Sequence, residues 1–187
     1  MPDTPTNIRL GLLETAEFKA SPNKNERPNP CDIRLIIVHG ISLPPDQFGA
    51  GWIDDFFLNQ LDPKQHPYFQ EICTLKVSSH LLIRRDGSLT QYVPFQERAW
   101  HAGVSQYAGE DNCNDFSIGI ELEGADHIPY TEKQYQALSC CCQTLIQHYP
   151  ELSTETIVGH CDVSPGRKTD PGESFDWQKF RTLLTGR

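Results

Sequence analysis

Short β-rich runs alternate with helical patterns along this chain, and the alternation constrains its fold more than any other feature of the sequence. Apolar, β-branched runs predict strands at residues 33–39, 116–124 and 156–160. Two further β-rich runs flank Asp86 and Gly87, a turn pair that predicts a hairpin over 78–93. Large apolar residues at helical spacing predict helices within 48–61, 130–149 and 175–184. We therefore expect an α/β fold in which a single mixed, central β-sheet is flanked by α-helices.

The size and charge of the chain limit the class of protein. A length of 187 residues suits a single domain over 1–187, with its core at about 30–184 and an N-terminal extension over 1–29. No apolar stretch approaches the ~20 residues of a spanning helix, and the N-terminus lacks the regions of a secretory signal. We therefore expect a cytoplasmic monomer that does not bind membranes. The net charge of −9 argues against binding to nucleic acid, which needs clustered Lys and Arg.

The cysteine pattern does not predict a disulfide framework. The seven cysteines are an odd number, and Cys140, Cys141 and Cys142 are consecutive, so we expect reduced thiols. These three fall within a helical pattern, where small thiols pack as hydrophobic side chains.

Two histidines at strand ends and a nearby aspartate predict a metal site. His39 ends the run 33–39, His160 ends the run 156–160, and Asp170 follows in a loop rich in Gly and Pro. Folding could bring both imidazoles to one edge of the sheet. A catalytic zinc ion takes three such ligands and keeps one position for water, so these residues are the predicted ligands of Zn²⁺.

Other side chains nearby could also bind the metal. Cys161 and Asp162 compete for the ligand role beside His160, and His80 and His101 are further candidates. Neighbours on an extended chain point to opposite sides, so we expect Cys161 to face away from His160.

Hydrolysis at a zinc site also needs a base and a group that stabilises the oxyanion. Glu121 is the natural base, because burial among the apolar residues of 116–124 would raise its pKa toward working pH. The pattern alone does not separate it from Glu123, which lies on the same face of the strand. Lys168, two residues before Asp170, could place its ammonium group beside the reacting oxygen.

The loop from Trp100 to Gly103 combines an aromatic plane, the imidazole of His101 and a flexible glycine. Such a loop could stack against a sugar ring or a peptide. A buried tryptophan would give the same pattern, so the sequence leaves both interpretations open.

Six runs carry a resemblance to a known family. They lie at 41–45, 82–87, 91–95, 99–105, 113–124 and 167–172. Through them the chain resembles the AmpD family, the cytoplasmic 1,6-anhydro-N-acetylmuramyl-L-alanine amidases, and the similarity extends from about residue 9 to 184. The resemblance implies a zinc amidase with the fold of phage T7 lysozyme and the peptidoglycan recognition proteins. Its substrate would be an anhydro-muropeptide, cleaved between the lactyl group of anhydro-N-acetylmuramic acid and L-alanine.

The same resemblance implies the roles of five residues. Zinc would be held by His39, His160 and Asp170. Glu121 would be the catalytic carboxylate, and Lys168 would lie beside the scissile carbonyl. Loss of the activity would let muropeptides accumulate that raise β-lactamase expression in bacteria carrying an inducible AmpC enzyme.

Two differences from the family pattern concern substrate binding. Gly40 stands where the family has an asparagine beside the first histidine, and the loop 109–115 is acidic where relatives are arginine-rich. Lys76 could supply part of that charge as a point donor, without the bidentate geometry of arginine. The residues expected to bind substrate are Gly40, Lys76, Trp100, His101 and Arg167.

Two other functions are compatible with these residues. The chain could be a non-catalytic muropeptide-binding module of the same fold, although the complete ligand set argues against it. It could also be a zinc-dependent regulator that senses thiol state through Cys161.

Overall fold

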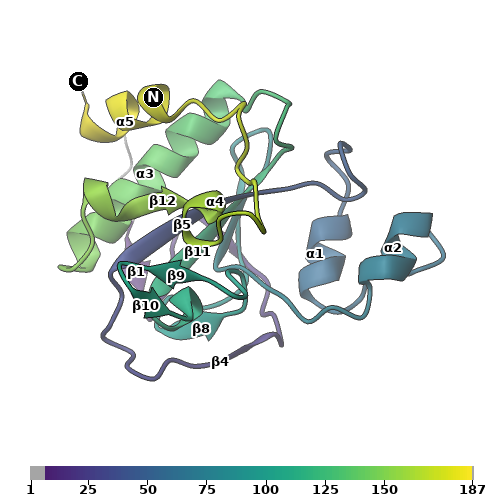
Figure 1. The fold of residues 1–187 in the computed structure, drawn as a ribbon, viewed down its shortest axis with the longest axis horizontal. Coiled ribbons are helices and arrows are strands. Elements are labelled where there is room, and N and C mark those ends of the chain that lie inside the picture. Colours follow the sequence, from purple (N-terminus) through teal and green to yellow (C-terminus); the bar gives the residue numbers. More distant parts are fainter. Residues whose placement is uncertain (1–6, 187) are drawn as a thin grey trace.

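A six-stranded sheet forms the centre of the computed structural model, which describes residues 7–186 (Figure 1). Its strands follow the order β12 (Ile157–Gly159), β5 (Leu35–Ile41), β11 (Ser117–Glu123), β6 (Leu81–Ile83), β7 (Leu89–Gln91) and β3 (Glu17–Phe18). β7 runs antiparallel to β6, whereas β12, β5, β11 and β6 are parallel to one another. The sheet is therefore mixed and the hairpin over 78–93 is confirmed.

The two central strands, β5 and β11, lie deepest in the molecule. The central strands of a parallel sheet are covered on both faces, which explains why the run before His39 is continuously apolar and fully buried. Their pairing continues to Glu123 opposite Ile41. The predicted strand 33–39 is therefore displaced: β5 begins two residues later and ends two residues later, because β11 provides partners as far as Ile41.

Two helices cover one face of the sheet. α3 (Glu132–His148) has Thr131 as its N-cap, whose hydroxyl accepts the amide hydrogen of Gln134, while the Gln134 side chain accepts that of Thr131. Figure 1 shows α5 (Trp177–Thr185) beside α3 on the same side of the strands. Both helices share one core cluster with the strands through Leu138, Cys141, Cys142, Leu145, Phe180 and Leu184. The predicted helix 130–149 is confirmed.

A lobe of two short helices, α1 (Trp52–Phe57) and α2 (Pro67–Ile72), lies on the other side of the molecule (Figure 1). It packs its own apolar cluster against Leu82 of β6 and the segment after β7. The helix predicted within 48–61 is α1, which is shorter than the apolar pattern because Gly49 and Asn59 have positive φ angles of 82° and 60° on either side of it. α2 was not predicted.

The N-terminal residues are built into the fold. β3 is an edge strand of the main sheet, and β4 (Lys24–Glu26) pairs with β8 (Glu97–Ala99). Two smaller pairs join β1 (Ile8–Arg9) to β2 (Leu12–Leu13) and β9 (Gln106–Tyr107) to β10 (Glu110–Asp111). The described part of 1–29 is thus not an extension outside the core. Met1–Thr6, where a secretory signal was sought, lie outside the described residues.

The predicted strand 156–160 divides into two elements. β12 ends at Gly159, and His160 begins the short helix α4 (His160–Val163). Neighbouring side chains on a helix are ~100° apart, so the alternation expected of an extended chain does not govern His160 and Cys161.

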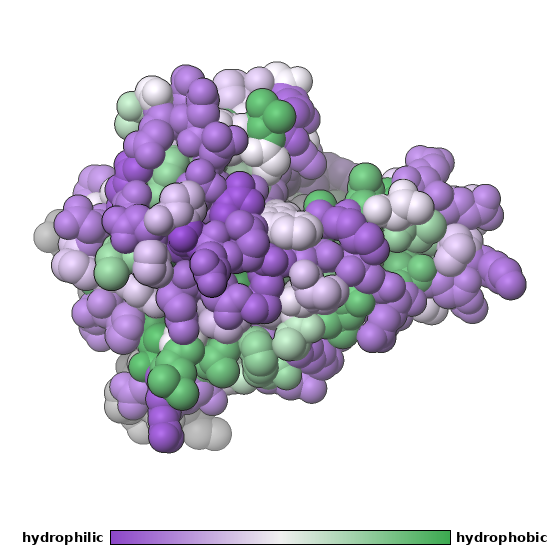
Figure 2. All heavy atoms as spheres, turned by 90° about the horizontal axis from the view of Figure 1, so that it is seen from below, coloured by the Kyte–Doolittle hydropathy of each residue, from purple (hydrophilic) through white to green (hydrophobic). Residues whose placement is uncertain are grey.

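Figure 2 shows hydrophilic side chains over most of one face of the molecule, with hydrophobic side chains in smaller groups between them. Within residues 7–186, no helix combines the length and the apolar character needed to cross a membrane. Within residues 7–186 none of the seven cysteines is part of a disulfide.

Candidate metal centre and active-site cavity

Pairing within the sheet brings the predicted metal ligands together. β12 pairs in parallel with β5, and His160 follows β12 directly, beside His39 of β5. Asp170 returns to the same place because its backbone carbonyl accepts the amide hydrogen of Cys161 at 3.0 Å. Three side chains from separate parts of the chain therefore converge, and we call His39, His160 and Asp170 the triad.

The ligand atoms of the triad form a nearly equilateral triangle. His39 Nδ1 lies 3.0 Å from His160 Nδ1 and 3.2 Å from Asp170 Oδ2, and His160 Nδ1 lies 3.0 Å from the same oxygen. Tetrahedral ligands bound to zinc at ~2.0–2.1 Å are about 3.3 Å apart. The triad therefore has the spacing and the donor types of a zinc site.

Burial and hydrogen bonding favour the protonation states that a metal needs. Burial lowers the pKa of His39 to about 4, so its ring is neutral at pH 7. Burial of Asp170 opposes its ionisation, but the close polar contacts of its carboxylate with His160 and His39 hold its pKa below the usual range. Zinc binds carboxylates and neutral imidazoles, so these groups are ready to accept it.

A backbone carbonyl orients His160. Its Nε2–H donates to the carbonyl oxygen of Ala102 at 3.1 Å. A neutral ring that donates through Nε2 has its lone pair on Nδ1, which is the atom that faces the other two triad members.

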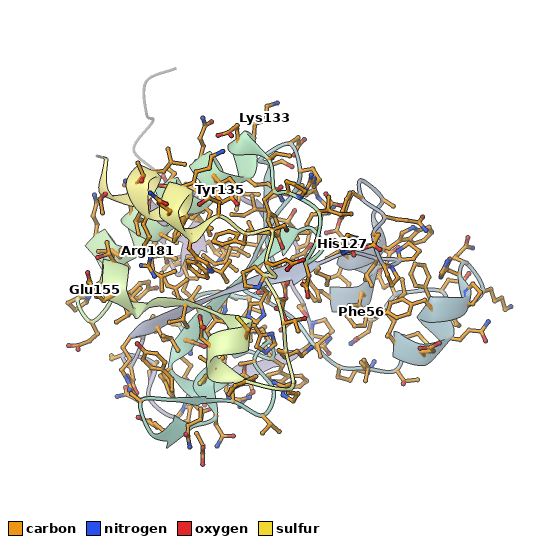
Figure 3. The ribbon with its side chains drawn as sticks, turned by 45° about the horizontal axis from the view of Figure 1, so that its top comes forward. Phe56, His127, Lys133, Tyr135, Glu155 and Arg181 are labelled. Atoms are coloured by element: carbon orange, nitrogen blue, oxygen red, sulfur yellow. The ribbon has the colours of Figure 1, made fainter. Side chains whose placement is uncertain are left out.

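A cavity of about 500 Å³ opens beside the triad, a size typical of sites for small organic ligands. The lobe contributes Phe56, Tyr68 and Ile72 to its wall, and the segment after β11 contributes His127. Figure 3 shows Phe56 and His127 on the lobe side of the molecule, away from Tyr135 and Arg181 of α3 and α5. Sequence reasoning missed these wall residues, since only the packing of the lobe against the sheet places them here.

Glu121 is the carboxyl group that faces the triad. Its Oε1 lies 4.0 Å from His39 Nδ1, and its Oε2 is buried without a hydrogen-bond partner. Burial raises the pKa of Glu121 well above its usual range, and the charge of Asp170 raises it further, while Lys168 opposes the shift. A buried polar atom without a hydrogen-bond partner lowers the stability of the fold. In a cavity, such an atom is typical of a catalytic group.

Glu123, the alternative base, has partners for both carboxylate oxygens. Oε1 accepts the amide hydrogen of Gly49 at 2.7 Å, and Oε2 accepts that of Arg85 at 3.2 Å. It thus ties the segment before α1 and the hairpin to β11. The sequence could not choose between Glu121 and Glu123 as the base. The partners of Glu123 favour Glu121.

Lys168 lines the same cavity as the triad. Its backbone amide donates to the carbonyl of Ser164 at 3.0 Å, which fixes the turn that follows α4. Burial causes most of the change in the pKa of His39 and of Glu121. The positive charge of Lys168 adds to the lowering of the pKa of His39 and opposes the rise in that of Glu121.

The alternative metal ligands have other partners. Asp162 Oδ2 accepts the amide hydrogen of Gly159 at 2.7 Å, and His80 Nδ1 accepts that of Gly119 at 3.0 Å. Cys161 lies outside the group of potential ligands, and burial raises the pKa of its thiol.

Three of the five residues expected to bind substrate line the cavity, namely Gly40, Trp100 and His101. Burial and the neighbouring histidine His39 lower the pKa of His101, so its ring is neutral. Lys76 is not part of the cavity wall. Arg167 is not part of it either, because its guanidinium donates to the carbonyls of Ala102 at 2.6 Å and Val104 at 2.8 Å. Arg167 therefore holds a loop in place.

The acidic loop 109–115 also lies apart from the cavity wall. Glu110 forms an ion pair with Arg34 at 2.7 Å, and Asp111 accepts a hydrogen bond from Gln106 at 2.9 Å. The carboxylates that distinguish this loop from the family pattern are thus engaged locally.

The chain matches known proteins over most of its length. The family model Amidase_2, described as N-acetylmuramoyl-L-alanine amidase, matches residues 28–173, which include the triad, Glu121 and Lys168. A protein of Escherichia coli K12, 1,6-anhydro-N-acetylmuramyl-L-alanine amidase AmpD, is 54% identical over 178 residues, which are 95% of this chain and 97% of that protein. The protein of the same name from Haemophilus influenzae is 53% identical over 174 residues, 93% of this chain and 95% of its own length.

Solved structures show the same likeness. The crystal structure of a Se-Met AmpD derivative has a TM-score of 0.92 and 52% identity, and the match covers 95% of this chain and 98% of that one. A complex of the amidase AmiD from E. coli with the substrate anhydro-N-acetylmuramic acid-L-Ala-D-gamma-Glu-L-Lys has a TM-score of 0.59 at 27% identity. That match covers 97% of this chain and 66% of the AmiD chain.

Proposed function

The chain belongs to the N-acetylmuramoyl-L-alanine amidase family, and we propose that it hydrolyses, with zinc, the amide bond between 1,6-anhydro-N-acetylmuramic acid and L-alanine in muropeptides. It is an amidase of peptidoglycan recycling, as its near-full-length identity to the AmpD enzymes indicates. One observation carries the chemistry: the unpartnered, buried oxygen of Glu121 lies beside a triad with the spacing of zinc ligands.

The triad residues His39, His160 and Asp170 would hold the metal. Zinc in such a site polarises a carbonyl group and lowers the pKa of a water molecule from 15.7 to ~7. The remaining steps belong to protein side chains. Glu121 takes a proton from the attacking water, because its carboxyl group faces the triad and one oxygen has no other partner. The same group then returns the proton to the leaving amine of L-alanine.

Lys168 stabilises the negative charge that develops on the amide oxygen. It lines the same cavity as Glu121 and His39, and its charge opposes the rise in the pKa of Glu121. An ammonium group that interacts mainly with the charge developing on the amide oxygen lowers the barrier without strengthening substrate binding.

Trp100 provides a flat wall for the sugar or the peptide. Its indole Nε1 donates to Asn25 Oδ1 at 2.6 Å, which fixes the plane of the ring. Gly40 adds no side chain beside His39, so polar contacts to substrate come from other parts of the wall. The complex of the relative AmiD with an anhydro-muramyl tripeptide supports a substrate of this class.

We place the reaction in the cytoplasm and in a single amidase domain that includes the N-terminal strands. Seven cysteines without a disulfide among them suit a reducing compartment, and β3 and β4 pair with strands of the same fold.

The decisive experiment uses purified protein and anhydro-muramyl tripeptide, with and without a chelator, and identifies the products by mass spectrometry. We expect free tripeptide and anhydro-N-acetylmuramic acid, no cleavage after chelation, and recovery when zinc is added. Binding of the muropeptide without release of tripeptide would contradict the proposal and indicate a binding module.

Glu121→Ala tests the base. We expect one zinc ion per chain, as in the parent, and a loss of turnover of ~10²–10⁴-fold, the usual contribution of a general acid–base group. Elemental analysis and initial rates measure the two quantities. Cleavage at the parent rate would show that another group takes the proton.

A further inference from the structure

A line of hydrogen bonds leads from the triad residue His39 into the protein interior through His101. His39 Nε2 and His101 Nδ1 are 3.0 Å apart. The two rings are nearly perpendicular, at 87°, with centroids 5.0 Å apart, so the contact is directed through ring nitrogens. His101 therefore touches the nitrogen of His39 that points away from the other triad members.

The next contacts fix the direction of this line. His101 Nε2 lies 3.4 Å from Ser117 Oγ, and Ser117 Oγ donates its hydrogen to the carbonyl of Cys113 at 2.6 Å. Because that hydroxyl hydrogen is used, the oxygen accepts from the Nε2–H of His101. A neutral imidazole carries one N–H, so His101 Nδ1 is an acceptor and His39 Nε2 donates to it. The lone pair of His39 is thereby left on Nδ1, which faces the triad.

The backbone of β11 makes room for the ring of His101. A Cβ atom on Gly119 would lie 2.5 Å from His101 Cγ and 2.6 Å from Nδ1, so no other residue at this position would leave the ring where it is. Gly119 lies in the middle of β11, where its amide also donates to His80. The glycine is thus explained by the place of His101 and not by a turn.

The residue after His101 acts on the second histidine of the triad. Asn114 Oδ1 accepts the amide hydrogens of His101 at 3.1 Å and Ala102 at 2.8 Å, so one side chain fixes both residues. The carbonyl of Ala102 accepts from His160 Nε2, as described above. Two consecutive residues therefore contact the outer nitrogens of both histidine ligands.

From these contacts we infer that His101 is a positioning residue for the metal, and that the segment His101–Ala102 sets the tautomer and ring orientation of His39 and His160. This inference rests on the proposed zinc site. It also changes the role of His101, which the sequence suggested as a substrate contact: the residue reaches the cavity wall, but its ring nitrogens are used by His39 and Ser117.

Two substitutions at His101 distinguish the effect of its hydrogen-bond acceptor from the effect of the space that its side chain fills. His101→Asn keeps an acceptor oxygen near the position of Nδ1, whereas His101→Leu fills similar space without one. We expect His101→Leu to weaken zinc binding by ~10–100-fold, the usual effect of losing such a partner, and His101→Asn to recover most of it. Competition with a chromophoric chelator measures the zinc affinity, and thermal unfolding of the metal-free proteins checks that both variants fold.

The outcomes decide between the two roles of His101. Parent zinc affinity in His101→Leu together with a raised KM would overturn the inference and assign the residue to the substrate. If His101→Leu does not fold, His101→Gln replaces it, because its longer side chain moves the acceptor away from His39. Equal zinc affinities of the Asn and Gln variants would then overturn the inference. Absence of zinc binding by the parent protein would instead refute the proposed function.

Discussion

The two faces of strands β5 and β11 differ in that one carries buried polar and titratable side chains and the other does not. The face under α3 and α5, the helix face, presents only apolar side chains: Ile36, Val38, Ile118, Ile120 and Leu122. The other face, the site face, presents His39, Gly119 and Glu121 in the same strands beside the buried apolar residues Leu35 and Ile37, because side chains alternate along a strand. Each apolar side chain buried on the helix face contributes roughly 1.5–3 kcal/mol. On the site face burial leaves one oxygen of Glu121 unpartnered, so that face costs stability.

This difference teaches how the fold supports the chemistry. The helix face provides the stability that a buried carboxyl group and two buried histidines reduce, as is usual where activity needs a strained or unpaired group. Truncating an apolar side chain on the helix face should therefore lower stability and leave turnover unchanged. Removing the charge of Glu121 on the site face should raise stability and abolish turnover.

The largest effect on stability is expected on the helix face. Leu138 of α3 is fully buried in the core cluster, so Leu138→Ala should lower the free energy of unfolding by about 2–5 kcal/mol through lost burial and a cavity. The folded fraction should retain the parent kcat, since the residue lies on the far side of the sheet from the triad. Urea unfolding and initial rates at 25 °C measure both quantities.

Gln136→Ala is the matched control, because Gln136 lies on the exposed side of the same helix. It should change the free energy of unfolding by no more than about 0.5 kcal/mol. A fall in kcat per folded Leu138→Ala molecule would mean that the two faces are coupled, and the comparison would fail.

A smaller effect, of opposite sign, is expected on the site face. Burial, then the charge of Asp170, raise the pKa of Glu121 well above the value of ~4.3 in an unfolded chain. The ionised carboxylate therefore destabilises the metal-free protein. This penalty is absent below pH ~4.3 and grows as the pH rises toward the folded pKa. Glu121→Gln should raise the free energy of unfolding of metal-free protein by about 1–3 kcal/mol at pH 7, with little gain at pH 4, while turnover is lost.

Glu123→Gln serves as the counterpart on the same strand. Both oxygens of Glu123 accept backbone amide hydrogens, so this variant should lose stability. Denaturant unfolding at the two pH values compares the variants. A gain for Glu121→Gln that is equal at pH 4 and pH 7 would show that its charge is not the cause.

The helix face was also the part most readable from the sequence. The run before His39, the hairpin and the long helix after Thr131 each follow from local patterns of apolar residues, turn residues and an N-cap. The short helix α2 and the pairing of β4 with β8 were not predicted, because their few residues carry little local signal and depend on packing.

The sequence predicted which residue types form the site, but it could not predict which hydrogen-bond partner each of them has. Strand ends and a Gly- and Pro-rich loop identified the triad, which the fold brings within hydrogen-bonding distance. The pattern could not choose between Glu121 and Glu123, since the deciding donors, Gly49 and Arg85, are 74 and 38 residues away from Glu123 in the chain. Arg167 was expected at the substrate for its charge, but its guanidinium is used by loop carbonyls.

The smallest effect should come from the residue next to a triad member. Cys161 follows His160 on the first turn of α4, and burial raises the pKa of its thiol, so it stays protonated and is a poor metal ligand. Its contribution to the triad is its backbone amide, which donates to the carbonyl of Asp170 and is kept by any non-proline residue. Cys161→Ser should therefore leave zinc content unchanged and turnover within about twofold, whereas His160→Ser should lose the metal. A tenfold loss of zinc affinity in Cys161→Ser would instead make the thiol part of the site and revive the hypothesis of a thiol-sensing regulator.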